Sequence, residues 1–325
     1  MSIKTYAQAV GEAMREEMRR DEDVILFGED VAEHGGIFQV SQGFLKEFGP
    51  DRIMNTPIAE TAIIGSAIGA AVTGFRPIAE IMYGDFMLVA FHEIFHMVPK
   101  WRFMHGEDFR LPLVIRSAQG SSYGAACEHS NTVESLFAHS PGLTIITPAN
   151  AYDAKGLLKS AIRSNNPVLF LEHKQLYKEK MEVPDEEYTL PIGKADIKRE
   201  GGDVTVVATG LMVKRALEAA DKLSEVGIEV EVVDPRTIAP MDYETIYASV
   251  RKNHYVVVAE EAQKTMGMGA EIASRIQADC FYDLDAPVKR VAALDLPIAY
   301  NVQLEMEIIP SVDDIYEAVR QVLNK

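Results

Sequence analysis

The stretch 54–71, MNTPIAETAIIGSAIGAA, places one acidic residue, Glu60, among apolar residues just ahead of a helix rich in Gly and Ala. The helix is expected at 62–73, and its Gly65 and Gly69 allow close packing because they lack side chains. A carboxylate in apolar surroundings either takes part in chemistry or has a partner that the local sequence does not show. Capping of the helix is the simpler alternative, because acids are common in first turns.

Apolar runs typical of buried strands alternate with helical segments around this stretch, which favours an α/β fold with a largely parallel sheet. In the first half, helices are expected at 88–103 and 151–163, and strands at VILF (24–27) and within RPIAEIMYGDF, PLVIRSAQG, LTIITPAN and NPVLFLEH. An opening amphipathic helix, with Thr5 as a cap, is predicted from four apolar residues at four-residue spacing: Tyr6, Val10, Met14 and Met18.

A charged segment with two prolines, KEKMEVPDEEYTLPIGKADIKREGGD, indicates a boundary between two domains. We expect the first domain at 1–185, a linker at 186–202 and the second domain at 203–325. The alternation then resumes, with strands at VTVVATG, IEVEVVD, YVVVAEE and VKRVAAL. Ser311 and Asp314 form a capping-box pattern ahead of the last helix.

The 325 residues carry a net charge of −17, which disfavours nucleic acid as a partner and is compatible with a basic protein partner. Cys127 and Cys280 lie far apart without a CxxC pattern, so we expect a reducing compartment and no disulfide framework. No apolar run approaches the ~20 residues that span a bilayer. We therefore predict a cytoplasmic protein of a bacterium or archaeon, with no nucleic acid and no membrane as partner.

Several motifs follow one another in a characteristic order: GEDV, NTPIAE, AEIMYGDF, the His-Ser pair at 129–130 and VVDPRTIAPMD. In their order and spacing the chain resembles the thiamine-diphosphate enzymes of the transketolase-like group. The resemblance is to the beta subunit of the decarboxylase component of 2-oxo acid (pyruvate or branched-chain) or acetoin dehydrogenase complexes. It implies an α/β fold with an N-terminal pyrimidine-binding domain, built on a mostly parallel sheet, and a transketolase C-terminal-like domain.

The resemblance also implies roles for five residues around the cofactor. The carboxylate of Glu60 hydrogen-bonds a ring nitrogen of the aminopyrimidine and so activates thiamine diphosphate. Phe86 packs against the pyrimidine ring, Ile58 and Met82 line the same pocket, and Glu29 lies near the pyrimidine end. From the sequence alone, the apolar residues are equally expected in the core and Glu29 in a turn.

His129 is the second candidate catalytic residue, which in the family helps to position the substrate or the lipoyl group. Its loop is polar, and an imidazole can donate, accept or carry charge near neutral pH. The family usually shows QHSQ where this chain has Glu128, His129, Ser130 and Asn131, so the neighbours of the histidine differ. His139 lies nearby and is expected to be structural.

One motif of the family is missing from the sequence. We find no GDG followed some thirty residues later by NN, the pattern that holds magnesium and diphosphate. The resemblance therefore implies a separate alpha subunit that carries the magnesium, two of each subunit in a heterotetramer with beta–beta contacts, and a lipoyl acyltransferase core as a further partner. It also implies a monovalent cation such as potassium, held largely by backbone oxygens around Ala161, Ser164 and Asn166. The implied enzyme is an oxidoreductase that cleaves a C–C bond at a carbonyl and transfers the acyl group to a lipoyl acceptor.

Other interpretations stay open at this point. His92, Glu93 and His96 spell H-E-x-x-H, a zinc-hydrolase motif, although no third ligand follows at a customary spacing. The GMG run at 267–269 resembles a dinucleotide loop, but it lacks the third glycine and favours the start of a helix instead. A non-catalytic assembly subunit, and the C-terminal half of a transketolase or deoxyxylulose-phosphate synthase, are the remaining alternatives.

Overall fold

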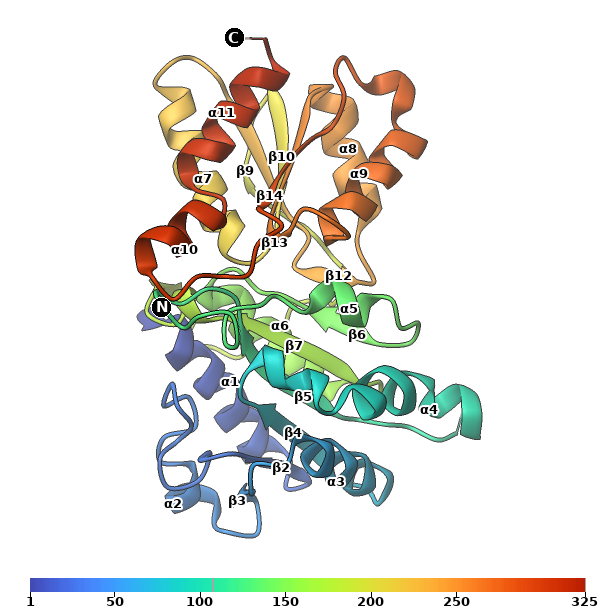
Figure 1. Cartoon of the computed structure of the whole chain (residues 1–325). Coiled ribbons are helices and arrows are strands. Elements are labelled where there is room, and N and C mark those ends of the chain that lie inside the picture. Colours follow the sequence, from blue (N-terminus) through green and yellow to red (C-terminus); the bar gives the residue numbers. More distant parts are fainter. Residues whose placement is uncertain (107, 325) are drawn as a thin grey trace. The chain divides into compact units, whose positions relative to one another are not determined.

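The computed structural model describes residues 1–106 and 108–324. The chain forms two compact units (Figure 1). The first unit comprises 1–119 and 136–192, and the second comprises 120–135 and the chain from 193 onward. The domain limits expected from the sequence stay a prediction. That 120–135 groups with the second unit is a feature the sequence did not suggest.

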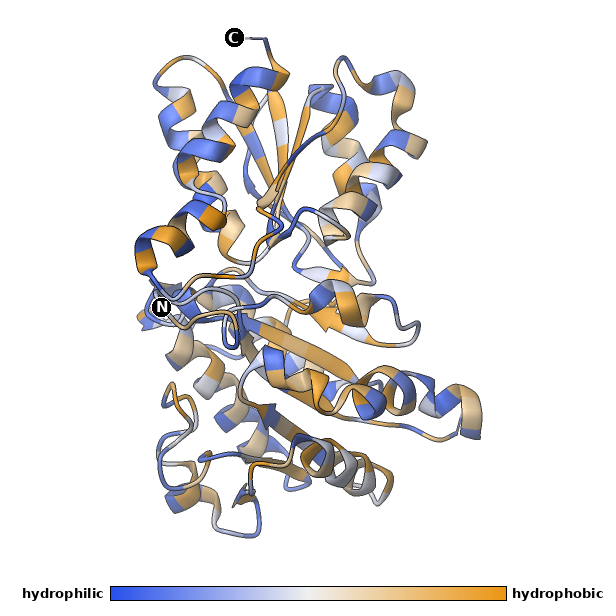
Figure 2. Cartoon of the chain, viewed as in Figure 1, coloured by the Kyte–Doolittle hydropathy of each residue, from blue (hydrophilic) through white to orange (hydrophobic). Residues whose placement is uncertain are grey.

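The first unit is built on parallel strands in the order β6-β7-β5-β4-β2-β3. Residues of the four central strands are almost all buried, which explains why they read as unbroken apolar runs rather than alternating ones. Figure 2 shows apolar residues along the strands and mixed polarity on the helices. The strands are β2 (Val24–Gly28), β3 (Ile53–Asn55), β4 (Arg76–Ile81), β5 (Val114–Gln119), β6 (Thr144–Ile146) and β7 (Val168–His173).

The opening helix is confirmed as α1 (Tyr6–Arg20). Thr5 caps it through a capping box with Gln8, and the four apolar residues at four-residue spacing are all buried. A short antiparallel pair, β1 (Ser2–Thr5) with β8 (Lys180–Val183), joins the two ends of the unit. The remaining helical segments are α2 (Phe44–Phe48), α3 (Glu60–Val72), α6 (Ala151–Arg163) and η3 (Lys174–Leu176), and α5 (Glu134–Ala138) spans the junction with the second unit.

The single helix expected at 88–103 is wrong in detail. The structure has a 3-10 turn, η1 (Gly84–Leu88), a π-helical turn, η2 (His92–Met97), and then α4 (Val98–His105). Pro99 explains the change, because it has no N–H to donate to the carbonyl of Phe95 four residues earlier. The hydroxyl of Ser140 donates to that carbonyl instead, at 2.6 Å.

The second unit contains a five-stranded sheet in the order β14-β13-β10-β11-β9, parallel except for β9. The Ser311–Asp314 capping box is confirmed, and Gly267 stands directly before α9, so the GMG run begins a helix. The strands are β9 (Asp196–Arg199), β10 (Val204–Ala208), β11 (Val230–Asp234), β12 (Thr237–Ala239), β13 (Val256–Gln263) and β14 (Lys289–Ala293). The helices are α7 (Leu211–Ser224), α8 (Tyr243–Asn253), α9 (Met268–Asp279), η4 (Phe281–Asp283), α10 (Val302–Ile308) and α11 (Val312–Val322).

Candidate functional site

Glu60 is the first residue of α3 and is 6% exposed. Ala59, which precedes it, offers no side-chain cap, so the free N–H groups and the positive end of the helix favour a negative charge here. The Glu60 carboxylate makes no hydrogen bond or ion pair with any other described residue. A buried carboxylate without a partner among the described residues suits the binding of a ligand that offers a donor.

Glu29 directly follows β2 and is 7% exposed. Its Oε1 is buried and has no hydrogen-bond partner among the described residues. Burial raises the pKa of Glu29, and the nearby carboxylates of Glu60, Asp30 and Glu80 raise it further. The structure therefore brings Glu29 and Glu60 together at the carboxyl end of the sheet, where open α/β sheets bind their ligands.

The third carboxylate, Glu80 near the end of β4, belongs to a buried ion cluster that the sequence analysis missed. The guanidinium of Arg116 on β5 donates to Glu80 and, through Nε and Nη2, to both oxygens of Glu172 on β7. The hydroxyl of Tyr177 also donates to Glu172, at 2.8 Å. Burial lowers the pKa of Arg116, but Glu172 and Glu80 outweigh it and hold the pKa well above its usual value. A charged residue in the interior of each of these apolar strands was the available signal.

The three apolar residues predicted to line the cofactor pocket have different environments. Met82, just after β4, and Phe86, on η1, are half-buried. Ile58 is 81% exposed, so the alternative that it belongs to the core is wrong. The hydroxyl of Thr61 donates to the carbonyl of Val89 at 3.1 Å, which ties the start of α3 to the segment that follows Phe86.

His129 is half-buried in the loop 120–135 of the second unit. Its backbone N–H donates to the carbonyl of Ala126 at 3.4 Å. The hydroxyl of the next residue, Ser130, is buried without a hydrogen-bond partner among the described residues. His139 is exposed and belongs to the first unit.

The predicted cation loop follows α6. The carbonyl of Ala161 accepts from the N–H of Ser164, and the carbonyl of Asn166 accepts from the hydroxyl of Ser164, each at 3.1 Å. The carbonyl of Ser164 accepts from Arg76 at 2.6 Å. A carbonyl oxygen has two lone pairs, so each of the three retains some acceptor capacity, and the monovalent-cation site stays a prediction.

The H-E-x-x-H motif lies on the π-helical turn η2. The rings of His92 and His96 are 5.1 Å apart, and Nδ1 of His96 is 3.1 Å from the ammonium of Lys100. Within the part of the chain that the structure describes, no group of three or more His, Cys, Asp or Glu residues could hold a metal ion. Among the residues that the structure describes, the zinc-hydrolase interpretation therefore finds no third ligand.

Two family models match the chain, one to each part. Residues 3–180 match the pyrimidine binding domain of transketolase, and residues 193–315 match the transketolase C-terminal domain. Together they confirm the predicted pair of α/β domains, of the class that binds thiamine diphosphate. Across residues 1–106 and 108–324, no helix has the length and apolar character needed to cross a membrane.

Curated relatives narrow this class. The chain is 44% identical over 323 residues to the 2-oxoisovalerate dehydrogenase subunit beta of Bacillus subtilis, with 99% of both chains covered. It is 43% identical over 324 residues to the pyruvate dehydrogenase E1 component subunit beta of Staphylococcus epidermidis, again with 99% of both covered. It is 42% identical over 335 residues to the beta subunit of the acetoin:2,6-dichlorophenolindophenol oxidoreductase of Bacillus subtilis, covering 99% of this chain and 98% of that one. The chain belongs to the family of E1 beta subunits of 2-oxo acid and acetoin dehydrogenase complexes.

Solved structures agree on the fold. A split-gene transketolase, described as an inactive beta4 tetramer, superposes with a TM-score of 0.82 at 25% identity, with 98% of both chains covered. A transketolase from Pichia stipitis superposes with a TM-score of 0.73 at 13% identity and covers the whole of this chain but 46% of its own. The second likeness supports the fold alone.

Proposed function

We propose that this chain is the beta subunit of a thiamine-diphosphate-dependent 2-oxo acid or acetoin dehydrogenase. The reaction cleaves a C–C bond at a carbonyl and transfers the acyl group to a lipoyl arm, whose disulfide is reduced. The observation that carries the proposal is the buried Glu60 carboxylate at the start of α3, which has no partner among the described residues and lies beside Glu29.

Glu60 would bind the aminopyrimidine of the cofactor and hold a proton at its ring nitrogen. When bound, thiamine diphosphate supplies an electron sink at the carbonyl carbon of the substrate. The burial of Glu60 limits exchange of that proton with water, and the unpaired Oε1 of Glu29 offers a second acceptor. Phe86, Met82 and Ile58 would contact the ring, and His129 would position the substrate or the lipoyl group.

A separate alpha subunit would supply the diphosphate and magnesium site, because the sequence lacks the GDG…NN pattern. The face of α3 that carries Gly65 and Gly69 is exposed, and a Cβ at either glycine would meet no other atom within 4 Å. Such a smooth surface suits the close approach of another chain. The inactive beta4 tetramer of the split-gene transketolase is consistent with a beta chain that needs a partner. We expect two of each subunit, with beta–beta contacts.

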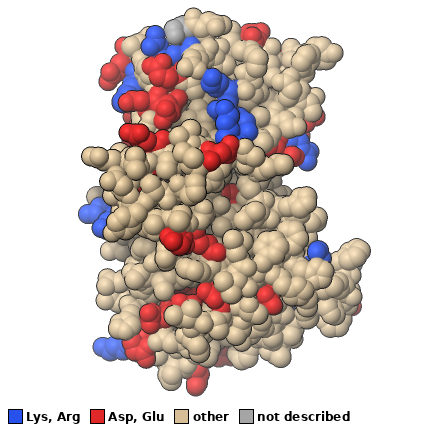
Figure 3. Space-filling view, in the orientation of Figure 1, with Lys and Arg blue, Asp and Glu red and all other residues tan. Residues whose placement is uncertain are grey.

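The further assignments follow from the same family. The net charge of −17, with acidic side chains spread over the face drawn in Figure 3, suits a basic subunit-binding domain of the acyltransferase core. The carbonyls of Ala161, Ser164 and Asn166 would hold potassium. The location we propose is the cytoplasm of a bacterium.

The substitution Glu60→Gln tests the proposal in the complex reconstituted with its alpha subunit. We expect decarboxylation to fall by about a hundredfold or more, because the amide cannot share the pyrimidine proton. Glu244→Gln is the matched control, since Glu244 is an exposed acid in the first turn of α8. Near-normal decarboxylation by Glu60→Gln would remove Glu60 from the mechanism.

A transketolase activity is the second candidate, favoured by the likeness to the split-gene enzyme. Its lower identity, 25% against 44% for the 2-oxoisovalerate dehydrogenase subunit, makes it the weaker one. Transfer of ketol units between sugar phosphates by the reconstituted complex, without acyl transfer to a lipoyl domain, would decide for transketolase. Absence of any turnover with the alpha subunit would instead indicate a non-catalytic assembly subunit.

A further inference from the structure

The loop that carries His129 is held by a buried carboxylate of α10. Glu305 is 1% exposed, and its Oε1 accepts from the N–H of Tyr123 at 3.0 Å while its Oε2 accepts from the N–H of Gly124. Among the described residues, no Lys or Arg pairs with Glu305. The charge of this carboxylate is therefore compensated by the loop backbone itself, through charge-assisted hydrogen bonds.

The backbone that these bonds hold is in a conformation that a free loop rarely adopts. Tyr123 has φ +57° and Ala126 has φ +63°, both in the left-handed region that non-glycine residues avoid. Such residues persist where the surrounding structure fixes them. Successive backbone N–H groups in this kind of turn form a concavity that binds an anion, and here the anion is the Glu305 carboxylate.

Two further contacts connect this turn to the rest of the loop. The N–H of Ser121 donates to Oε1 of Glu261 on β13 at 2.7 Å. The N–H of Gly120 donates to the carbonyl of Asn131 at 3.1 Å and closes the base of the loop. In the sequence His129 lies between the turn held by Glu305 and the closed base, and its own backbone N–H donates to the carbonyl of Ala126 at 3.4 Å.

We propose that Glu305 is a positioning residue for His129. Its carboxylate fixes the turn at Tyr123 and Gly124, and this turn positions the following segment, 125–131, which carries His129. The proposal rests on the proposed role of His129 toward the substrate or lipoyl group. Misplacement of a reacting group by about 1 Å can lower a rate about a hundredfold, so a residue that touches no substrate can still matter to the reaction.

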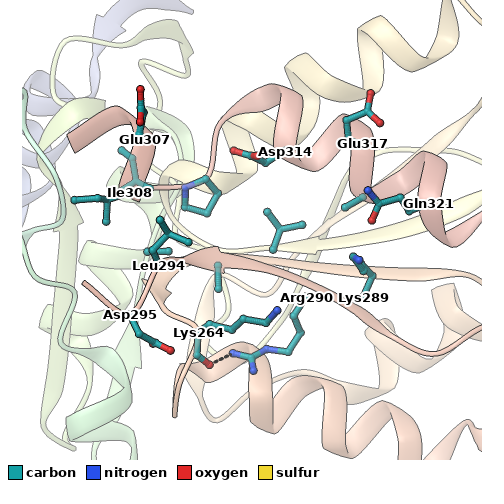
Figure 4. A pocket seen from close by; sticks show the side chains of 16 residues that line it. Lys264, Lys289, Arg290, Leu294, Asp295, Glu307, Ile308, Asp314, Glu317 and Gln321 are labelled. Carbon is teal, nitrogen blue, oxygen red and sulfur yellow. Dashed lines mark hydrogen bonds between the residues drawn. The ribbon is translucent and has the colours of Figure 1, made fainter. Parts of the chain in front are cut away.

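The same helix provides a matched control. Glu307 lies two residues further along α10, which on a helix is nearly the opposite face. It is exposed and lines a different pocket of about 370 Å³ between β14 and α11 (Figure 4). Glu307→Gln therefore removes one charge from α10 without touching the loop.

Hydrogen exchange of the intact chain tests the positioning step without any substrate. In Glu305→Gln the amides of the 120–131 segment should exchange about tenfold faster or more, because one of the two accepting oxygens becomes an NH2 group, which donates and cannot accept from the loop. Exchange elsewhere, and in Glu307→Gln, should stay as in the wild type. Unchanged exchange at 120–131 in a folded Glu305→Gln chain would overturn the proposal.

Kinetics of the reconstituted complex test the consequence for catalysis. In Glu305→Gln we expect acyl transfer to the lipoyl domain to fall about 10- to 100-fold. His129→Ala should impair the same step, and Glu307→Gln should be normal. Acyl transfer at the wild-type rate despite faster exchange would overturn the proposal. If the proposed function itself is wrong, the result that shows it is a different one, namely normal decarboxylation by Glu60→Gln.

A second variant covers the case in which Glu305→Gln does not fold. A Cβ added at Gly124 would lie 3.0 Å from the carbonyl oxygen of Tyr300, and Gly124 has φ +99°. Gly124→Ala therefore displaces the turn from α10 while Glu305 stays in place. It should reproduce both the faster exchange and the slower acyl transfer, and normal values of either would contradict the proposal.

Discussion

At the scale of single residues, the site concentrates carboxylates that the protein does not neutralise. Glu29 is close enough to Glu60 and Glu80 for their charges to disfavour its ionisation, and burial disfavours it more. Arg116 binds Glu80 but leaves Glu29 without a cation. Arrangements of this kind destabilise a fold, and they occur where a ligand uses the unpaired groups.

The pKa of Glu29 predicts a stability effect with a definite sign. Because this pKa is raised above its ordinary value of 4.5, the folded chain holds the proton more tightly than the unfolded chain. The stabilisation that comes from this bound proton is fully present at a pH below the ordinary pKa. It is lost as the pH rises through the pKa that Glu29 has in the folded chain. Glu29→Gln resembles the protonated form. The unfolding free energy of the variant minus that of the wild type should therefore increase as the pH rises from about 4.5.

Urea denaturation at a series of pH values measures this difference. The exposed Glu22 just before β2 is the matched control, and Glu22→Gln should show no such rise. If the free energy of unfolding of Glu29→Gln instead falls relative to the wild type above pH 5, the folded chain stabilises Glu29 as an anion.

At the scale of elements, the structure shows which features a sequence can reveal. The strands and α1 were predictable because apolar residues recur with the period of each element. Pro99, which interrupts the helix before α4, is visible in the sequence, but the bond by which Ser140 satisfies the carbonyl of Phe95 is not, because Ser140 lies far away in sequence. The Glu305 and Glu261 contacts to the loop 120–124 were hidden for the same reason.

The same distinction between local and long-range features applies to the candidate site. Glu60 stood out because a charge in an apolar stretch is visible locally, and its burial is as expected. A charged residue inside each of β4, β5 and β7 is visible locally, but the meeting of their side chains depends on the pairing of these strands, which the local sequence does not show. The exposure of the Ile58 side chain was also not predictable, because it depends on which other parts of the folded chain pack over the turn before α3.

The π-helical turn predicts a specific cost for losing the Ser140 hydroxyl. Ser140 is 2% exposed, so Ser140→Ala leaves the carbonyl of Phe95 without its partner in a buried place. We expect the free energy of unfolding to fall by about 1–3 kcal/mol. Pro99→Ala supplies an N–H for the same carbonyl, so in this background Ser140→Ala should cost less, as a double-mutant cycle in urea would measure. Equal costs in both backgrounds would contradict this account of the turn.

At the scale of the whole molecule, the two units fold on this chain's own residues, whereas the proposed site calls for a second chain. Each unit has its own sheet and its own buried core. The chain has carboxylates that would hold the aminopyrimidine, but its sequence lacks the GDG…NN pattern that would hold diphosphate and magnesium. The exposed glycine face of α3, which begins with Glu60 itself, is where a partner could complete the site.

The last prediction concerns that face. Gly65→Leu should leave the chain folded and raise its stability slightly, because leucine favours a helix over glycine by about 0.5–1 kcal/mol, Gly65 is exposed, and a Cβ there meets no neighbouring atom within 4 Å. It should prevent assembly with the alpha subunit, because the bulk lies where the two chains would approach. Sedimentation of the mixed subunits measures assembly, and calorimetry should show little magnesium-dependent cofactor binding by the variant or by the isolated wild-type chain.

Ala278→Leu is the matched control, since Ala278 is an exposed position on α9 of the second unit. It adds comparable bulk to a helix surface and should assemble normally. Normal assembly by Gly65→Leu would place the alpha subunit elsewhere, and the glycines of α3 would then need another explanation. Tight magnesium-dependent binding by the wild-type chain alone would count against a site divided between two subunits, because the diphosphate would then be held by residues of this chain.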